Sequence, residues 1–95
     1  MSDVIEKAVE ALNGKIEQGF EGLAKFVIGE EGAIMVDADG ARAGDEDADV
    51  TLHAGLDTFR SMLEGNLNPT AAFMTGKLKI DGDMGMAMKL AQIFT

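Results

Sequence analysis

Residues 66–94 constrain the fold of this chain more than any other stretch, because they read as successive elements with clear boundaries. Asn68 is a good helix N-cap, Pro69 suits the first helical position, where no N–H is needed, and Gly76 is typical of a helix end. Residues 77–81 then alternate polar and apolar side chains, which predicts a strand with one face in water. A short helix and a half-exposed strand are therefore expected in direct succession.

A final helix is predicted over residues 84–94, after a turn at Gly82 and with Asp83 as its N-cap. Its polar side chains fall in one narrow stripe. Its apolar side chains cover roughly 200° of the circumference, whereas a one-sided surface helix needs roughly 100°. More protein, a second subunit or an apolar ligand has to cover the extra arc.

The run from residue 68 to residue 90 resembles the signature of the sterol carrier protein type two family, N-P-x-x-A-F-x-x-G-K-L-K-I-x-G-N-M-G-x-A-M-K-L. One departure is Asp83, where the family frequently has Asn, and both residues cap a helix equally well. Weaker resemblance extends over essentially the whole chain. The residues at matching positions are Asn68, Pro69, Ala72, Phe73, Gly76, Lys77, Leu78, Lys79, Ile80, Gly82, Met84, Gly85, Ala87, Met88, Lys89 and Leu90.

The composition of the chain favours one small globular domain over residues 1–95. A net charge of −9 repels nucleic acid and anionic membrane surfaces, so neither is an expected partner. The chain contains no cysteine, no apolar run that could span a bilayer and no secretory signal at its N-terminus. It also lacks a peroxisomal Ser-Lys-Leu ending, and we therefore expect a cytoplasmic protein without stable membrane insertion.

The N-terminal segment predicts a helix that covers a sheet. Ser2 can cap this helix, and apolar residues recur at helical spacing up to Ile16. Either Asn13-Gly14 or Gly19 can end it, and the sequence does not choose between them.

Three further strands are predicted over residues 23–28, 33–38 and 49–54, with a four-residue hairpin loop between the first two. Together they indicate an antiparallel meander with one face buried. A helix over residues 55–64, which Gly65 can end, then leads into the run described above.

The acidic run over residues 45–49 has the D-x-D-x-D spacing of a calcium loop. An EF-hand, however, needs glycine at its sixth position and glutamate at its twelfth, and the chain has Val50 and Leu56 there. A solvated loop between strands is the better interpretation.

Other motifs give no catalytic chemistry either. Gly76-Lys77 lacks the remaining residues of a phosphate-binding loop. His53 is the one histidine, and it has neither a nucleophile motif beside it nor a second metal ligand. We therefore expect no catalytic residues, no metal and no cofactor.

Methionines gather on the elements that we expect to face one another. Methionine is flexible and polarizable, so it repacks around apolar partners of different shapes, although each one alone could equally be ordinary core filling. In this motif context we predict an apolar cavity. The predicted lining residues are Phe59, Met62, Phe73, Met74, Leu78, Ile80, Met84, Met88 and Ala91.

The family resemblance implies an α+β fold with about five mostly antiparallel strands, helices on one face of the sheet, and an apolar tunnel between the sheet and the C-terminal helix. It also implies non-enzymatic binding and transfer of lipids such as fatty acids, fatty acyl-CoA, sterol-like or isoprenoid molecules. We expect the final helix to act as a lid over the tunnel.

Two alternatives use the same apolar surface. The chain could be an interaction module that docks on a protein partner or forms a homodimer. It could also be an accessory module that presents a quinone or isoprenoid intermediate to biosynthetic enzymes.

Overall fold

The computed structural model describes residues 3–16 and 20–92. The predicted cap at Ser2, the predicted stop at Gly19 and the end of the final helix at residues 93–94 lie outside these ranges. The elements in chain order are α1 (Asp3–Lys15), β1 (Ala24–Ile28), β2 (Gly32–Asp37), β3 (Gly40–Ala43), β4 (Val50–Ala54), α2 (Leu56–Leu63), α3 (Pro69–Met74), β5 (Leu78–Gly82) and α4 (Met84–Ala91).

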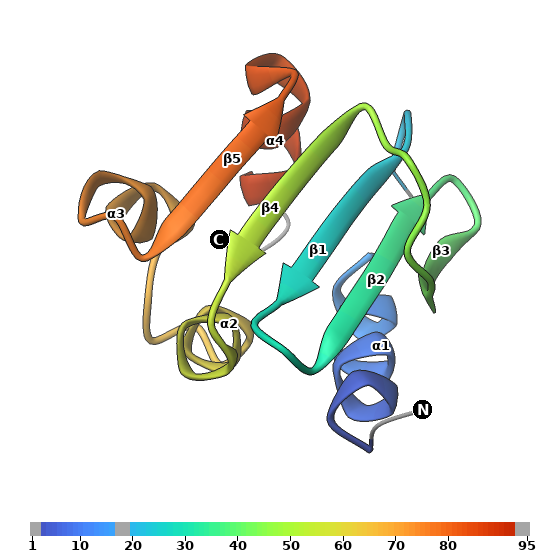
Figure 1. Cartoon of the computed structure of the whole chain (residues 1–95), viewed down its shortest axis with the longest axis horizontal. Coiled ribbons are helices and arrows are strands. Elements are labelled where there is room, and N and C mark those ends of the chain that lie inside the picture. The colour runs from blue at the N-terminus through green and yellow to red at the C-terminus, as the bar shows by residue number, and fades with distance from the viewer. Residues whose placement is uncertain (1–2, 17–19, 93–95) are drawn as a thin grey trace.

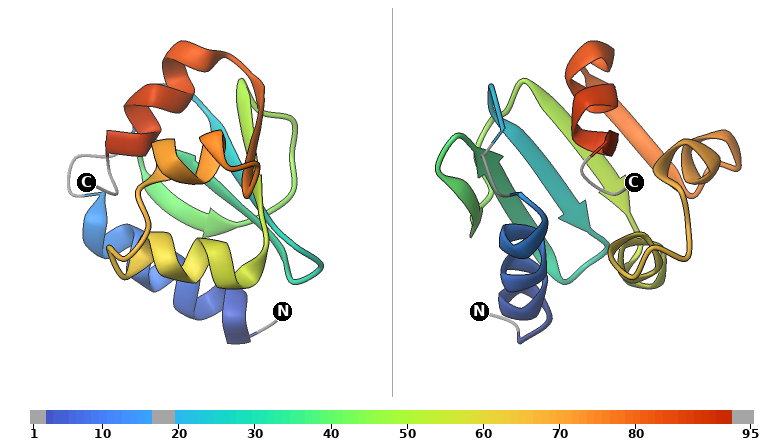
Figure 2. Two further views of the ribbon diagram at one scale, coloured as in Figure 1. Left: turned by 90° about the vertical axis from the view of Figure 1, so that its left-hand side faces the viewer. Right: turned by 180° about the vertical axis from the view of Figure 1, so that it is seen from behind.

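The five strands form one mixed sheet in the order β3-β2-β1-β4-β5 (Figure 1). Three of its pairings are antiparallel, and β1 pairs with β4 in parallel. All four described helices lie on one face of the sheet, as the side view shows (Figure 2). We refer to the other side of the sheet as the open face. This architecture confirms the predicted α+β fold.

The predicted antiparallel meander is wrong at β4, which lies parallel to β1 with Leu52 opposite Phe26. The cause is β3, a strand that the sequence did not reveal because Gly40–Ala43 contains no β-branched or aromatic residue. Since β3 occupies the far side of β2, the chain crosses back through residues 44–49 and places β4 on the free side of β1.

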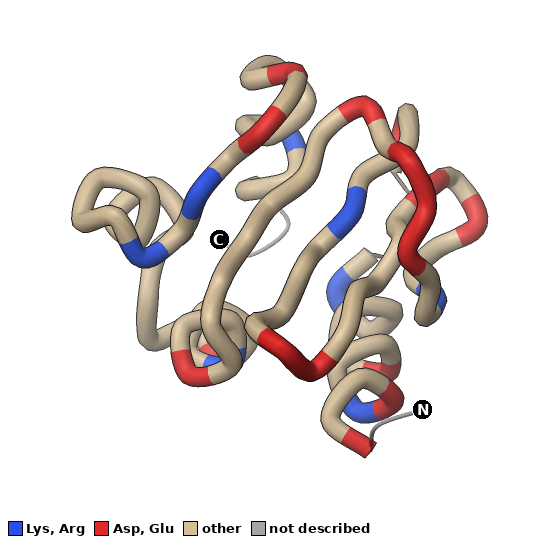
Figure 3. The backbone as a smooth tube through the Cα atoms, in the orientation of Figure 1, with Lys and Arg blue, Asp and Glu red and all other residues tan. Residues whose placement is uncertain are grey.

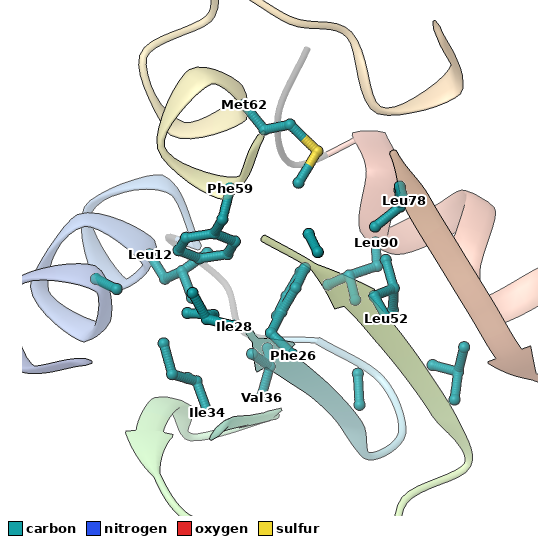
Figure 4. Close-up of a cluster of buried hydrophobic side chains, with 14 of the residues drawn as sticks. Leu12, Phe26, Ile28, Ile34, Val36, Leu52, Phe59, Met62, Leu78 and Leu90 are labelled. Carbon is teal, nitrogen blue, oxygen red and sulfur yellow. The ribbon is translucent and has the colours of Figure 1, made fainter. Parts of the chain in front are cut away.

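The main hydrophobic core lies between the sheet and the helices. Phe26 of β1 and Leu52 of β4 point towards the helices and are buried. The ring of Phe26 meets that of Phe59 in α2 edge to face, with 5.4 Å between ring centroids (Figure 4). Met62, one helical turn later, is also fully buried. Such aromatic and large apolar side chains supply much of the free energy of burial in a small domain.

The acidic loop over residues 45–49 crosses the open face near β2 and β1 (Figure 3). Asp45 accepts a hydrogen bond from Lys25 Nζ at 2.9 Å, and the N–H of Glu46 donates to Met35 Sδ at 3.5 Å. Met35 points to the open face, yet the loop buries it completely. The carboxylates of Asp45 and Glu46 themselves remain in solvent, as predicted for a solvated loop.

The first helix ends at Lys15, one residue beyond Asn13-Gly14, the first of its two candidate stops. The Asn13 side chain contacts the backbone of β3 instead of ending the helix. Its tertiary hydrogen bonds outweigh the weak helix preference of Asn and Gly.

Candidate functional site

The first wall of the site is α3, whose two ends follow the sequence signals. Asn68 Oδ1 accepts a hydrogen bond from the N–H of Thr70 at 2.7 Å, and Pro69 occupies the first turn. At the other end Gly76 adopts φ +78°, and the N–H of Lys77 donates to the carbonyl of Ala72 at 2.9 Å. This is a Schellman ending, in which glycine takes the left-handed position that side chains disfavour. It turns the chain directly into β5.

The second wall is the helix-facing side of β5. Leu78 is buried and Ile80 half-buried on this side, whereas Lys77 and Lys79 are exposed. This alternation confirms the strand predicted over residues 77–81. Because β5 is an edge strand, its apolar side chains form a wall that ends at the margin of the sheet.

The third wall is α4, which begins immediately after a tight turn. Gly82 has φ +107°, and a Cβ at this position would lie 2.5 Å from the carbonyl oxygen of Asp49. Only glycine therefore fits between β5 and β4 here. Asp83 then caps α4 by accepting a hydrogen bond from the N–H of Met86 at 3.1 Å, as predicted. The helix runs back over the sheet beside β4 and β5 (Figure 2).

These walls enclose an apolar groove of about 230 Å³ between the edge of the sheet, α3 and α4. No side chain that lines it carries a charge. Phe73, Met84 and Met88 are 43%, 47% and 68% exposed, so the groove is open to solvent along these side chains. The lining residues are Leu52, Pro69, Thr70, Phe73, Leu78, Ile80, Met84, Ala87, Met88 and Ala91.

Six of the nine predicted lining residues meet in this groove, namely Phe73, Leu78, Ile80, Met84, Met88 and Ala91. The structure places the other three elsewhere. Phe59 and Met62 belong to the closed core under α2, and Met74 points away from the groove and is 79% exposed.

Four groove residues were not among the predicted ones: Leu52, Pro69, Thr70 and Ala87. Ala87 could have been found, because positions 84, 87, 88 and 91 share one face of a helix. Leu52 could not, since its place beside the groove depends on the long-range pairing of β4 with β5.

A second hollow of about 370 Å³ lies between α1 and α2 and includes Phe59 in its lining. It is larger than the groove, but four ionisable side chains line it: Asp3, Lys7, Arg60 and Glu64. An apolar ligand bound here would remove water from these charged groups, which costs considerable free energy. The groove beside α4 is therefore the better candidate for an apolar ligand.

The perturbed ionisable groups lie away from the groove. Hydrogen bonds from the Arg42 side chain and from the N–H of Asp39 lower the pKa of Asp37, and the same contact with Asp37 raises the pKa of Arg42. His53 is exposed on the open face opposite Lys79. Within residues 3–16 and 20–92, no three His, Asp or Glu side chains lie close enough together to hold a metal ion.

No helix in the described part of the chain has the length and apolar character needed to cross a membrane.

Comparisons with known proteins agree with the predicted resemblance. The model of the SCP-2 sterol transfer family matches residues 3–95. Hydroxysteroid dehydrogenase-like protein 2 of Xenopus tropicalis is 40% identical over an alignment of 96 positions, which covers 92% of this chain and 23% of that protein. Sterol carrier protein 2 of Homo sapiens is 32% identical over an alignment of 99 positions, which covers 94% of this chain and 18% of that protein. The chain thus spans about a fifth of the length of these relatives.

Among solved structures, Sterol Carrier Protein-2 from Aedes aegypti in complex with the C16 fatty acid palmitate has the same fold, with a TM-score of 0.79 and 20% identity. The match covers 100% of this chain and 97% of that one. The match of the family model over residues 3–95 shows that the chain belongs to the SCP-2 sterol transfer family.

Proposed function

We propose that this protein binds and transfers single lipid molecules without catalysing a reaction, and that the groove beside α4 holds their apolar part. The observation that carries the proposal is the uncharged lining of that groove. Membership of a sterol transfer family supports it, as does the palmitate complex of the Aedes aegypti protein.

The energetics suit reversible carriage. Burying about ten methylenes of an acyl chain gives about 8 kcal/mol at roughly 0.8 kcal/mol each. The loss of translational and rotational freedom on binding costs several kcal/mol. A balance of about 4 kcal/mol corresponds to a dissociation constant near 1 mM, and burial of about five further methylenes of a C16 chain would bring it to the micromolar range, which permits both loading and release.

The size of the groove implies movement of α4. At about 230 Å³ it is smaller than most ligand pockets, which span about 300–1,000 Å³. The buried residues of α4 are Ala87 and Leu90, while Met84 and Met88 are exposed. Because the side of α4 that lines the groove is exposed at Met84 and Met88, we infer that α4 swings away from β5 to admit a long chain and acts as a lid.

Palmitate is a suitable test ligand because it is apolar over most of its length. Isothermal titration calorimetry of the protein with palmitate below its critical micelle concentration should give 1:1 binding in the micromolar range and a negative heat-capacity change. Native mass spectrometry should show the same stoichiometry. Absence of binding to palmitate, a fatty acyl-CoA and a sterol alike would overturn the proposal.

One observation favours a second candidate function, a protein interface. Met74 and Met88 are among the most exposed large apolar side chains and lie on α3 and α4, which both contact β5. Exposed apolar patches mark interaction sites as well as ligand grooves. Light scattering separates the two functions: an interface between copies gives a dimer that persists with lipid, whereas a carrier stays monomeric with and without it.

A further inference from the structure

The methionines that the structure describes include a buried and an exposed group that differ in access to solvent, with the half-buried Met86 of α4 between them. Met35 and Met62 are fully buried. Met74, Met84 and Met88 are 79%, 47% and 68% exposed. Within the exposed group, Met84 and Met88 line the groove, whereas Met74 does not. Since Met84 and Met88 are one helical turn apart, their thioethers lie on the same side of α4.

Exposed thioethers react with hydroperoxides. With hydrogen peroxide, the sulfur attacks one oxygen, the O–O bond breaks, and the departing hydroxide takes the proton of the transferred OH group to form water. The sulfur loses two electrons and becomes a sulfoxide, and the peroxide is reduced by the same two electrons. The product is a polar side chain where an apolar one stood, and methionine sulfoxide reductases reverse the change.

We propose that Met84 and Met88 form an oxidation site that controls access of apolar ligands to the groove. Two sulfoxides would give the wall of α4 strong hydrogen-bond acceptors, and no charged group lines the groove to pair with them. Binding an acyl chain against them would bury unsatisfied polar groups. The inference rests on the proposed lipid binding at this groove and adds its regulation by peroxide.

The coupling between ligand and oxidation is reciprocal, because each changes the same surface. A bound acyl chain covers the thioethers of Met84 and Met88 and therefore shields them from peroxide. Met74 is the matched internal control, since it is at least as exposed and lies outside the groove. Because Met35 and Met62 are fully buried, their oxidation would show that the protein unfolds during the reaction.

The first experiment is a time course with hydrogen peroxide, followed by peptide mass spectrometry of each methionine, with and without palmitate. Palmitate is saturated and does not consume peroxide. Met74, Met84 and Met88 should oxidise well before Met35 and Met62. Palmitate at saturation should slow oxidation of Met84 and Met88 by about tenfold and leave Met74 unchanged. Equal protection of all three, or of none, would overturn the proposal.

The second experiment compares the palmitate dissociation constant before and after peroxide. It should rise by about tenfold or more and return after treatment with sulfoxide reductases. The palmitate dissociation constant of the double variant Met84→Leu, Met88→Leu is also measured before and after peroxide. The ratio of its two values should stay near one, whatever the starting affinity of the variant. Met74→Leu should keep the full response of the unaltered protein.

The outcomes separate this inference from the proposed function. If the unoxidised protein binds none of palmitate, a fatty acyl-CoA and a sterol, the proposed lipid binding fails. If it binds, and the fully oxidised protein binds equally well with an unchanged circular dichroism spectrum, the lipid binding stands and the oxidation site is rejected.

Discussion

The side-chain amide of Asn13 forms two hydrogen bonds with the backbone of Ala41. Its Nδ2 donates to the carbonyl at 3.0 Å, and its Oδ1 accepts from the N–H at 2.8 Å. Ala41 lies in β3, at one edge of the sheet. The amide therefore occupies the backbone groups that another strand would use, which protects this edge from pairing with other chains.

Replacing Asn13 with Ala should lower the free energy of unfolding by about 1 kcal/mol, because two hydrogen bonds are lost and the better helix preference of Ala offsets part of that loss. Urea denaturation measures this difference. Glu10→Ala, on the exposed side of the same helix, is the control and should be close to neutral. If both variants behave alike, the amide contributes nothing to holding β3.

Gly82→Ala should destabilise the protein by about 2–4 kcal/mol, because a Cβ at φ +107° would be strained and would collide with the carbonyl of Asp49. Gly14→Ala is the matched control, since a Cβ on Gly14 in α1 meets nothing within 4 Å. It should stabilise the protein by about 0.5–1 kcal/mol. Thermal denaturation gives both values. Tolerance of Ala at position 82 would contradict the close contact between β5 and β4.

The pKa of Asp37 should rise towards its ordinary value in Arg42→Met, since the guanidinium that lowers it is removed. A lowered carboxyl pKa adds stability above the pKa of the unfolded chain, and this stability is lost as the pH falls through the folded pKa. The variant should therefore be less stable than the parent at neutral pH and equal to it in strong acid. Carboxyl-carbon NMR measures the titration. Arg60→Met, which removes the same charge from α2, should leave the Asp37 titration unchanged.

The elements around the groove could be predicted because their signals are local. The caps at Asn68 and Asp83 and the helix end at Gly76 each involve hydrogen bonds within five residues in the chain. Short-range rules of this kind act before tertiary structure is known. Six of the nine predicted residues meet in the groove because they lie on three consecutive elements whose ends these local signals define.

The remaining features depend on contacts between distant residues. The parallel pairing of β4 with β1 follows from the path of residues 44–49, which no local pattern specifies. Likewise, Phe59 and Met62 lie on an apolar helical stripe that could face either the core or the groove. The contact of Phe59 with Phe26, 33 positions earlier in the chain, turns this stripe into the core.

The central claim is that the groove beside α4 holds the apolar part of a lipid, and a pair of equal substitutions tests it most directly. Ala91→Phe adds a ring to a half-buried position that lines the groove. Ala71→Phe adds the same atoms to an exposed position of α3 outside it. Both variants are compared with the parent by calorimetric titration with palmitate, after circular dichroism has established that they are folded.

Ala91→Phe should weaken palmitate binding by about tenfold or more, since the ring displaces several methylenes at roughly 0.8 kcal/mol each. Ala71→Phe should keep the dissociation constant of the parent. Equal affinity of a folded Ala91→Phe variant and the parent would show that lipid binds elsewhere and would contradict the account.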